Sequence, residues 1–152
     1  MANHAMNRAA KILISANRII LGLIFIFASW GKVWEPAAFA RVIANYQILP
    51  EVFIAPAAIF LPWLELTCGI CLVVNRWTRG SATLLTALIV TFTAAICFNI
   101  YRGMDVACGC FTLDQSAPAG MWWYLLRDVI FLVMGVSTLR YAHTQKTAAI
   151  AA

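Results

Sequence analysis

Charged residues are scarce in this chain of 152 residues. Asp, Glu, Lys and Arg make up 11% of it, whereas 63% of the residues are hydrophobic. A typical soluble domain is about 25% charged and about 45–50% apolar, and a water-soluble globule of this length could not bury so much apolar surface. The composition therefore excludes a soluble enzyme and a disordered chain. The sequence also lacks a soluble domain, an internal repeat and a low-complexity tract.

Clustered basic residues are missing as well. The net charge is +5, but the 11 Lys and Arg residues stand singly between apolar blocks. A nucleic-acid-binding protein needs a basic patch or stripe on one face. The sequence therefore excludes nucleic acid as a partner. Basic residues that flank apolar blocks are instead typical of membrane proteins, in which they set the orientation of the helices.

Four long stretches contain little or no charge. A transmembrane helix needs roughly 20 mostly apolar residues to cross about 30 Å of hydrocarbon. Residues 12–33, 52–74, 80–101 and 121–142 each reach that length, and the third stretch has no charged residue. The sequence therefore predicts an all-α integral membrane four-helix bundle, with one domain over residues 1–152 and the lipid bilayer around it.

The basic residues predict how these helices are oriented. Arg8 and Lys11 precede the first stretch, but no Ala-x-Ala-like cleavage site follows it, so we expect an uncleaved helix rather than a secretory signal peptide. The two tails and the turn between the second and third stretches carry basic residues and no acid. Because such segments stay in the cytoplasm, both termini are predicted to be cytoplasmic in a bacterial inner membrane. Residues 34–51 and 102–120 would then face the periplasm.

A short helix is expected in the first of these outer segments. Phe39, Val42, Ile43 and Tyr46 recur at helical spacing between two prolines. This pattern predicts an amphipathic helix that lies in the membrane interface between the first and second spans, although a capped connector would show the same pattern. The second outer segment contains Gly, Pro and Ser and has no helical pattern.

Two of the five cysteines, Cys108 and Cys110, lie in the second outer segment. A free thiol does not normally persist on the oxidising side of the membrane. A Cys-Gly-Cys bridge closes a very small ring, which needs the sharp bend that Gly109 permits, and strained bridges are the labile, catalytic ones. We therefore expect disulfide exchange at this pair. The alternatives are a structural bridge, including one to Cys97, and a soft copper(I) site with Met104.

Cys68 and Cys71 form a Cys-x-x-Cys pattern inside the second predicted span. In other proteins this pattern marks redox or metal chemistry, and residues at i and i+3 lie near one another on a helix. The pair is either a second, buried dithiol that passes electrons outward or two small residues that let helices approach closely. We favour packing.

Four charged residues lie away from the ends of the predicted spans and are candidates for function: Arg18, Glu65, Arg127 and Asp128. Such residues are costly in a membrane and are functional by default, and their charges sum to zero, so we expect them to pair. Arg18 is expected to reach Glu65. Arg127 and Asp128 point about 100° apart on their helix, so we expect each to pair with another helix or with the loop. Arg127 would also stabilise a thiolate in the loop above it. The alternative role of all four is to fix the register of the bundle.

Two prolines, Pro56 and Pro62, precede Glu65 in the second span. A proline frees a carbonyl and kinks a helix, so we expect a small cavity beside Glu65, lined by Phe60 and Trp63. A quinone is the cofactor that such a cavity would suit.

Several short runs carry a family likeness, of which Cys-Gly-Cys-Phe is the most specific. They are Gly31-Lys32, residues 39–50 ending in Tyr-x-x-Leu-Pro, Pro62-Trp63-Leu64-Glu65, Arg102-Gly103, Cys108-Gly109-Cys110-Phe111 and Arg127-Asp128. On these runs the sequence resembles the MauE branch of the DoxX-like membrane proteins, named for methylamine utilisation. The resemblance implies a four-helix inner-membrane protein tied to periplasmic thiol–disulfide chemistry, beside a thioredoxin-like partner. Two features depart from the pattern: Thr-Leu-Asp follows Phe111 where relatives continue with glycine, and the pattern lacks Cys68 and Cys71.

Three functions are compatible with these observations. The first is a membrane thiol–disulfide oxidoreductase whose electrons pass to or from a quinone or a second membrane protein. The second is an assembly or maturation factor without turnover, in which the bridge shapes a docking loop for a soluble partner. The third is a protein that handles copper(I) or a small solute. We expect the first, because the Cys-Gly-Cys spacing suits exchange better than it suits stapling a fold.

Overall fold

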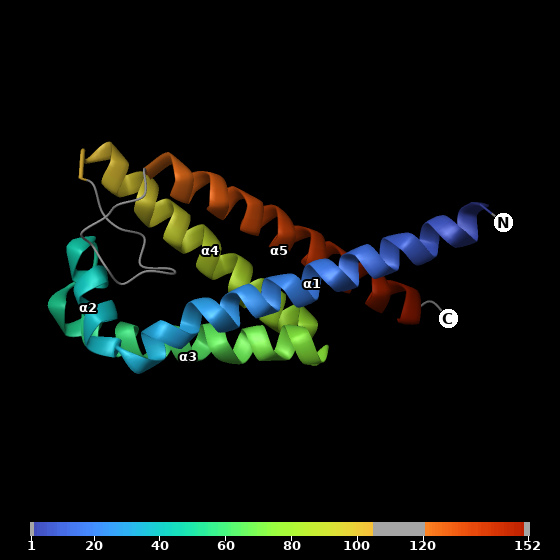
Figure 1. Cartoon of the computed structure of the whole chain (residues 1–152), viewed down its shortest axis with the longest axis horizontal. Coiled ribbons are helices and arrows are strands. Elements are labelled where there is room, and N and C mark those ends of the chain that lie inside the picture. The colour runs from blue at the N-terminus through green and yellow to red at the C-terminus, as the bar shows by residue number, and fades with distance from the viewer. Residues whose placement is uncertain (1, 105–120, 151–152) are drawn as a thin grey trace.

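The long apolar segments of this chain are expected to fold as helices. A helix pairs its own backbone polar groups and can therefore cross a lipid bilayer. The computed structural model describes residues 2–104 and 121–150, with side chains over 12–104 and 123–142. This part of the chain forms five helices: α1 (Ala2–Trp34), α2 (Pro36–Asn45), α3 (Glu51–Val74), α4 (Thr78–Tyr101) and α5 (Met121–Ile150) (Figure 1). The prediction of an all-α protein is confirmed.

Three helices of the described part are long and apolar enough to cross a membrane. They are the Ile12–Trp34 portion of α1, the whole of α3 and the whole of α4. Their bounds agree closely with three of the predicted spans. The fourth predicted span, 121–142, is helical as the first part of α5, but the Arg127–Asp128 pair makes it more polar than the other three. A crossing by α5 therefore stays a prediction.

The outer faces of the three apolar helices are themselves apolar. Only 22% to 33% of the residues in their most apolar stretches are buried inside the protein. The exposed side chains include Phe27, Phe53, Trp63 and Val90. A soluble protein rarely exposes a continuous apolar surface, whereas hydrocarbon accommodates one, so these faces suit a lipid bilayer.

The long helices pack as two antiparallel pairs. α1 makes its most extensive contacts with α3, and α4 makes its most extensive contacts with α5. Figure 1 shows both chain termini and the α3–α4 turn toward one end of the molecule. The other end holds α2 together with the end of α4 and the start of α5, and it is called the α2 end below.

A polar clamp joins the two helix pairs away from the α2 end. The side-chain Nδ2 of Asn17 in α1 lies 3.0 Å from the carbonyl oxygen of Met134, 3.0 Å from Ser137 Oγ and 3.1 Å from Thr138 Oγ1, all in α5. Hydrogen bonds between helices are worth about 0.6–2 kcal/mol each within membranes. The clamp therefore holds α1 against α5 at this level of the molecule.

Two glycines let the backbones of α1 and α3 approach closely. A Cβ atom on Gly22 would lie 2.8 Å from the carbonyl oxygen of Gly69, and a Cβ atom on Gly69 would lie 2.9 Å from that of Gly22. Small residues at such crossings are a recurrent feature of helix pairs in membranes. The crossing fixes the register that brings Glu65 beside the last turns of α1.

The short helix predicted between the first and second spans is confirmed as α2. It begins at Pro36, whose fixed φ suits the first turn of a helix. Its apolar side chains are buried and form a cluster with one residue of α3 and one of α4: Phe39, Val42, Ile43, Tyr46, Ala58 and Ile96. The apolar face of α2 therefore packs within the protein.

Candidate functional site

A buried ion pair joins α1 to α3. Nζ of Lys32, in the last turn of α1, lies 2.9 Å from Glu65 Oε2, and the two side chains are only 4% and 2% exposed. Ser29, one turn before Lys32, places its hydroxyl 3.3 Å from the same carboxylate oxygen. Two charges removed from solvent are stable only when paired and hydrogen-bonded, and Lys32 and Glu65 satisfy that requirement within one helix pair.

The prediction that Arg18 reaches Glu65 is wrong. The carboxylate of Glu65 is bonded to Lys32 instead. Arg18 lies 14 residues before Lys32 in the same helix, which separates the two by about 20 Å at 1.5 Å per residue. Its Nη1 atom is buried and has no hydrogen-bond partner among the described residues.

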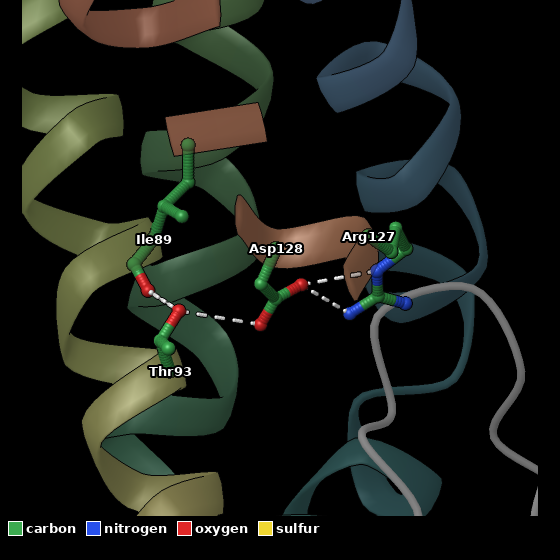
Figure 2. A network of polar contacts seen from close by, with 4 residues as sticks. All are labelled: Ile89, Thr93, Arg127 and Asp128. Atoms are coloured by element: carbon green, nitrogen blue, oxygen red, sulfur yellow. Dashed lines mark hydrogen bonds and ion pairs between the residues drawn. The ribbon is translucent and has the colours of Figure 1, made fainter. Parts of the chain in front are cut away.

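A second ion pair lies within α5 (Figure 2). Arg127 donates to Asp128 Oδ1 from Nη2 at 2.7 Å and from Nε at 3.0 Å. Thr93 of α4 places its hydroxyl 3.4 Å from Asp128 Oδ2 and donates to the carbonyl oxygen of Ile89 at 2.7 Å. The guanidinium also lies 5.4 Å from the ring of Tyr124, a distance typical of a cation–π contact.

The expectation that Arg127 and Asp128 cannot pair with each other is therefore also wrong. Neighbouring residues do point about 100° apart on a helix, but that angle describes the Cα–Cβ bonds. The long, flexible stem of arginine lets the guanidinium return to the next residue, which Figure 2 shows plainly. The opposite charges of Arg127 and Asp128 therefore offset each other within α5.

Both ion pairs line one small cavity between the four long helices. Its volume is about 30 Å³. The polar wall consists of Lys32, Glu65, Arg127 and Asp128, and apolar side chains of α1, α4 and α5 complete it: Ile24, Phe25, Ala28, Ile89, Phe92 and Phe131. The four charges sum to zero. A cavity of this size exceeds the roughly 10–15 Å³ that a water molecule needs, but it is too small for an aromatic ring.

The cavity expected beside Glu65 from the two prolines has different walls. α3 continues as a helix through Pro56 and Pro62. Phe60 and Trp63, the expected lining, are 67% and 53% exposed on the outside of the protein, whereas Glu65 points inward. Residues 60 and 63 therefore lie on a different face of α3 from residue 65, and the cavity beside Glu65 is closed by α1, α4 and α5 instead.

The described cysteines lie in the helices. Cys68 is buried in an apolar cluster that contains Leu21, Phe25 and Leu72, while Cys71 is half-buried and Cys97 is exposed on α4. These three cysteines form no disulfide with one another. Cys108 and Cys110, the predicted exchange pair, lie outside the described residues.

The segment that carries the Cys-Gly-Cys motif is attached at the α2 end. α4 ends at Tyr101 and α5 begins at Met121, and Figure 1 shows these two helix ends close together. Arg127 lies six residues into α5, which is about 9 Å along the helix from its start. Both buried ion pairs and the attachment points of the motif therefore belong to the same half of the protein.

Comparison with known proteins shows the family to which the chain belongs. A family model described as methylamine utilisation protein MauE matches residues 10–141. The chain belongs to the MauE family. No solved structure matches it.

Several curated MauE proteins are similar to this chain. The methylamine utilization protein MauE of Paracoccus denitrificans is 29% identical over 127 residues, which cover 83% of this chain and 68% of that protein. The protein of the same name from Methylophilus methylotrophus is 38% identical over 119 residues, covering 78% of this chain and 63% of the relative. The chain thus spans about two thirds of the length of these relatives.

Lys32 is the site residue that the sequence analysis missed. Lys32 stands at the very end of the predicted span 12–33, where a charged residue is expected to reach the membrane surface. The pattern did contain a signal: Phe25, Ser29 and Lys32 follow one another at helical spacing on the face that Leu21 begins. A polar residue on the buried face of a helix is expected to form a hydrogen bond with another buried residue. The register of α1 and α3 places Glu65 in that position.

Proposed function

We propose that this MauE-family chain is an inner-membrane thiol–disulfide redox protein of methylamine utilisation. In this proposal the Cys108-Gly109-Cys110 segment exchanges disulfides with a thioredoxin-like protein in the periplasm and so supports maturation of a periplasmic protein. The observation that carries the proposal is the Cys-x-Cys spacing itself, on the connection between α4 and α5. The names of the relatives supply the link to methylamine utilisation.

The distribution of charge supports a periplasmic location for this connection. The tails and the α3–α4 turn carry six basic residues and lie toward the end of the molecule opposite the connection (Figure 1): Arg8, Lys11, Arg76, Arg79, Arg140 and Lys146. Short segments rich in Lys and Arg are retained in the cytoplasm. With α5 crossing as a fourth span, both termini are cytoplasmic and the α2 end faces the periplasm.

The proposed exchange conserves atoms and electrons between the two proteins. A thiolate of the partner attacks one sulfur of the Cys108–Cys110 disulfide, the bond between the two cysteines breaks, and a mixed disulfide forms. The second thiolate of the partner then attacks the partner's sulfur in the mixed disulfide. A disulfide forms within the partner, the mixed disulfide breaks, and Cys108 and Cys110 are released as a dithiol. The partner has lost two electrons and two protons, which this chain has gained, and the reverse sequence returns them.

The buried charges hold each helix pair together near the connection between α4 and α5. Arg127 was expected to stabilise a thiolate in the loop, but its charge is offset by Asp128 at 2.7 Å. The ion pairs therefore support the proposal through the fixed geometry of α5 and of the helix ends that carry the loop. Lys32–Glu65 fastens the end of α1 to α3, and Asp128 also lies near the Thr93 hydroxyl of α4, so each ion pair restricts movement within one helix pair.

Trapping of the mixed disulfide tests the proposal. In cells that contain the Cys108→Ser or the Cys110→Ser variant, the remaining cysteine cannot be resolved from within, so a covalent adduct with the periplasmic partner should accumulate. The adduct is separated on a non-reducing gel and its partner is identified by mass spectrometry. Cys97→Ser, which removes an exposed thiol of α4, is the matched control and should trap nothing.

Two results would contradict the proposal. One is the absence of any adduct in both variants while growth on methylamine is lost, and the other is normal growth of both variants on methylamine when deletion of the whole chain abolishes it. The second result would favour an assembly factor without turnover.

A further inference from the structure

An apolar groove lies between α2, α3 and α4. The ring of Phe92 lines both this groove and the charged cavity. Its volume is about 230 Å³, close to eight times the volume of one water molecule in the liquid. Ten residues line it, none of them charged: Phe39, Val42, Ile43, Tyr46, Ile48, Leu49, Leu61, Thr91, Phe92 and Ala95. Ile48, Leu49 and Thr91 are exposed, so the groove opens on the outer surface of the helices, where lipid would lie.

Two aromatic rings form the wall between this groove and the buried ion pair. Phe39 and Phe92 both line the groove, and Lys32 Nζ lies 5.0 Å from the centre of the Phe39 ring and 5.8 Å from that of Phe92. Phe92 also lines the charged cavity. Rotation of this one side chain would therefore connect the apolar groove to the ammonium group.

Lys32 has hydrogen-bonding capacity beyond its ion pair. A lysine ammonium carries three N–H donors, and among the described residues its hydrogen-bond acceptor is a single oxygen, Glu65 Oε2. The two phenylalanine rings face the same nitrogen but accept hydrogen bonds only weakly. A carbonyl oxygen that reached the cavity would therefore find a buried, charged donor.

We propose that the groove and the cavity together bind an apolar molecule that ends in a carbonyl oxygen and enters sideways from the membrane. The apolar body occupies the groove, the Phe92 ring turns aside, and the carbonyl oxygen accepts a hydrogen bond from Lys32. Glu65 already balances the charge of Lys32, so the site selects a neutral head group. The proposal is independent of the Cys-Gly-Cys motif, because the groove is lined by residues between 39 and 95 and the hydrogen-bond donor is Lys32 of α1.

Two kinds of membrane molecule share this chemistry: a quinone with a ring carbonyl and a lipid with an ester carbonyl. A binding assay on the purified full chain in lipid nanodiscs distinguishes them. The probes are a decyl-substituted benzoquinone, methyl decanoate and, as a molecule without a carbonyl, decane. Infrared spectroscopy of carbonyl-¹³C-labelled probes reports the hydrogen bond directly, because donation from an ammonium moves the carbonyl stretch to a lower wavenumber.

We expect at least one carbonyl probe to bind saturably, with a shifted stretch, and decane to bind much more weakly. The double variant Lys32→Met/Glu65→Leu, which leaves no unpaired charge, should lose the shift and bind the probe about tenfold to hundredfold less tightly, as expected for a hydrogen bond to a charged group worth about 1.5–3 kcal/mol. The carbonyl probe that binds more tightly identifies the natural class of ligand.

Ala95→Phe is a second variant that leaves the ion pair intact and fills the groove. It should abolish saturable binding, whereas Phe98→Ala, on the exposed face of α4, should leave binding unchanged. The proposal is overturned if decane binds as tightly as the carbonyl probes, if the stretch of the bound probe does not move, or if Ala95→Phe, still folded by circular dichroism, binds the probe like the wild type.

Discussion

Replacing Lys32 by methionine isolates the energy of the buried ion pair. Methionine has nearly the volume and shape of the lysine stem, so the packing against Phe39 and Phe92 is retained while the ammonium is lost. Glu65 is then left as a carboxylate at 2% exposure, and among the described residues its remaining hydrogen-bond partner is the Ser29 hydroxyl, 3.3 Å from Oε2. A buried charge without its partner is the costliest state that a single substitution here can create.

The expected loss follows from the burial of both groups. Removing one member of a buried pair typically destabilises a protein by about 3–5 kcal/mol, whereas replacing both members with apolar side chains is often neutral or stabilising. Lys32→Met should therefore lower the free energy of unfolding by about 3–5 kcal/mol. The double variant Lys32→Met/Glu65→Leu should recover most of this loss, since no charge remains to be buried.

Unfolding of the purified chain in mixed detergent micelles, followed by circular dichroism, measures these differences. Arg41→Met, which removes an exposed charge from α2, is the control and should stay within about 0.5 kcal/mol of the wild type. The reasoning is refuted if Lys32→Met is no less stable than Arg41→Met, or if the double variant is less stable than Lys32→Met alone.

Two further predictions concern packing and orientation. Gly22→Ala should lower the free energy of unfolding by about 1–3 kcal/mol in the same assay, because its Cβ would lie 2.8 Å from the carbonyl oxygen of Gly69. Gly31→Ala is the control and should cause no loss, since a Cβ at that position meets nothing within 4 Å. Equal effects of the two substitutions would contradict the close α1–α3 crossing. The orientation is tested in a variant whose five cysteines are replaced by serine. In that variant a membrane-impermeant maleimide should label Arg41→Cys in intact cells, but should label Trp77→Cys only after the membrane is disrupted. The reverse pattern would contradict the proposed orientation.

The helices were predictable because their cause is local. Length and apolar composition located α1, α3 and α4 closely, and the spacing of Phe39, Val42 and Ile43 located α2. Glu65 and Asp128 could also be singled out, since an acid inside an apolar stretch needs a partner wherever the stretch folds. In each case one short window of sequence contains the whole physical argument.

The partners of these acids were not predictable, because pairing depends on the relative register of helices distant in sequence. The Gly22–Gly69 crossing sets that register and places Lys32, rather than Arg18, beside Glu65. Arg127 pairs with its own neighbour through the flexibility of its side chain, which a helical wheel does not represent. Phe60 and Trp63 were misplaced for a related reason: proximity to Glu65 in sequence says little about which face a residue shares with it.

The placement of the two described ion pairs shows where this protein can open at low cost. Lys32–Glu65 lies within the α1–α3 pair, and Arg127–Asp128 lies within α5, so neither ion pair bridges the seam between the α1–α3 and α4–α5 pairs. The charged cavity and the apolar groove both lie along this seam, and Asn17 holds it together away from the α2 end. Separating the helix pairs at the α2 end would therefore leave both of these described ion pairs intact. Because separating buried charges is far more costly than parting apolar surfaces that lipid can cover, a ligand from the membrane should enter along this seam, beside Phe92.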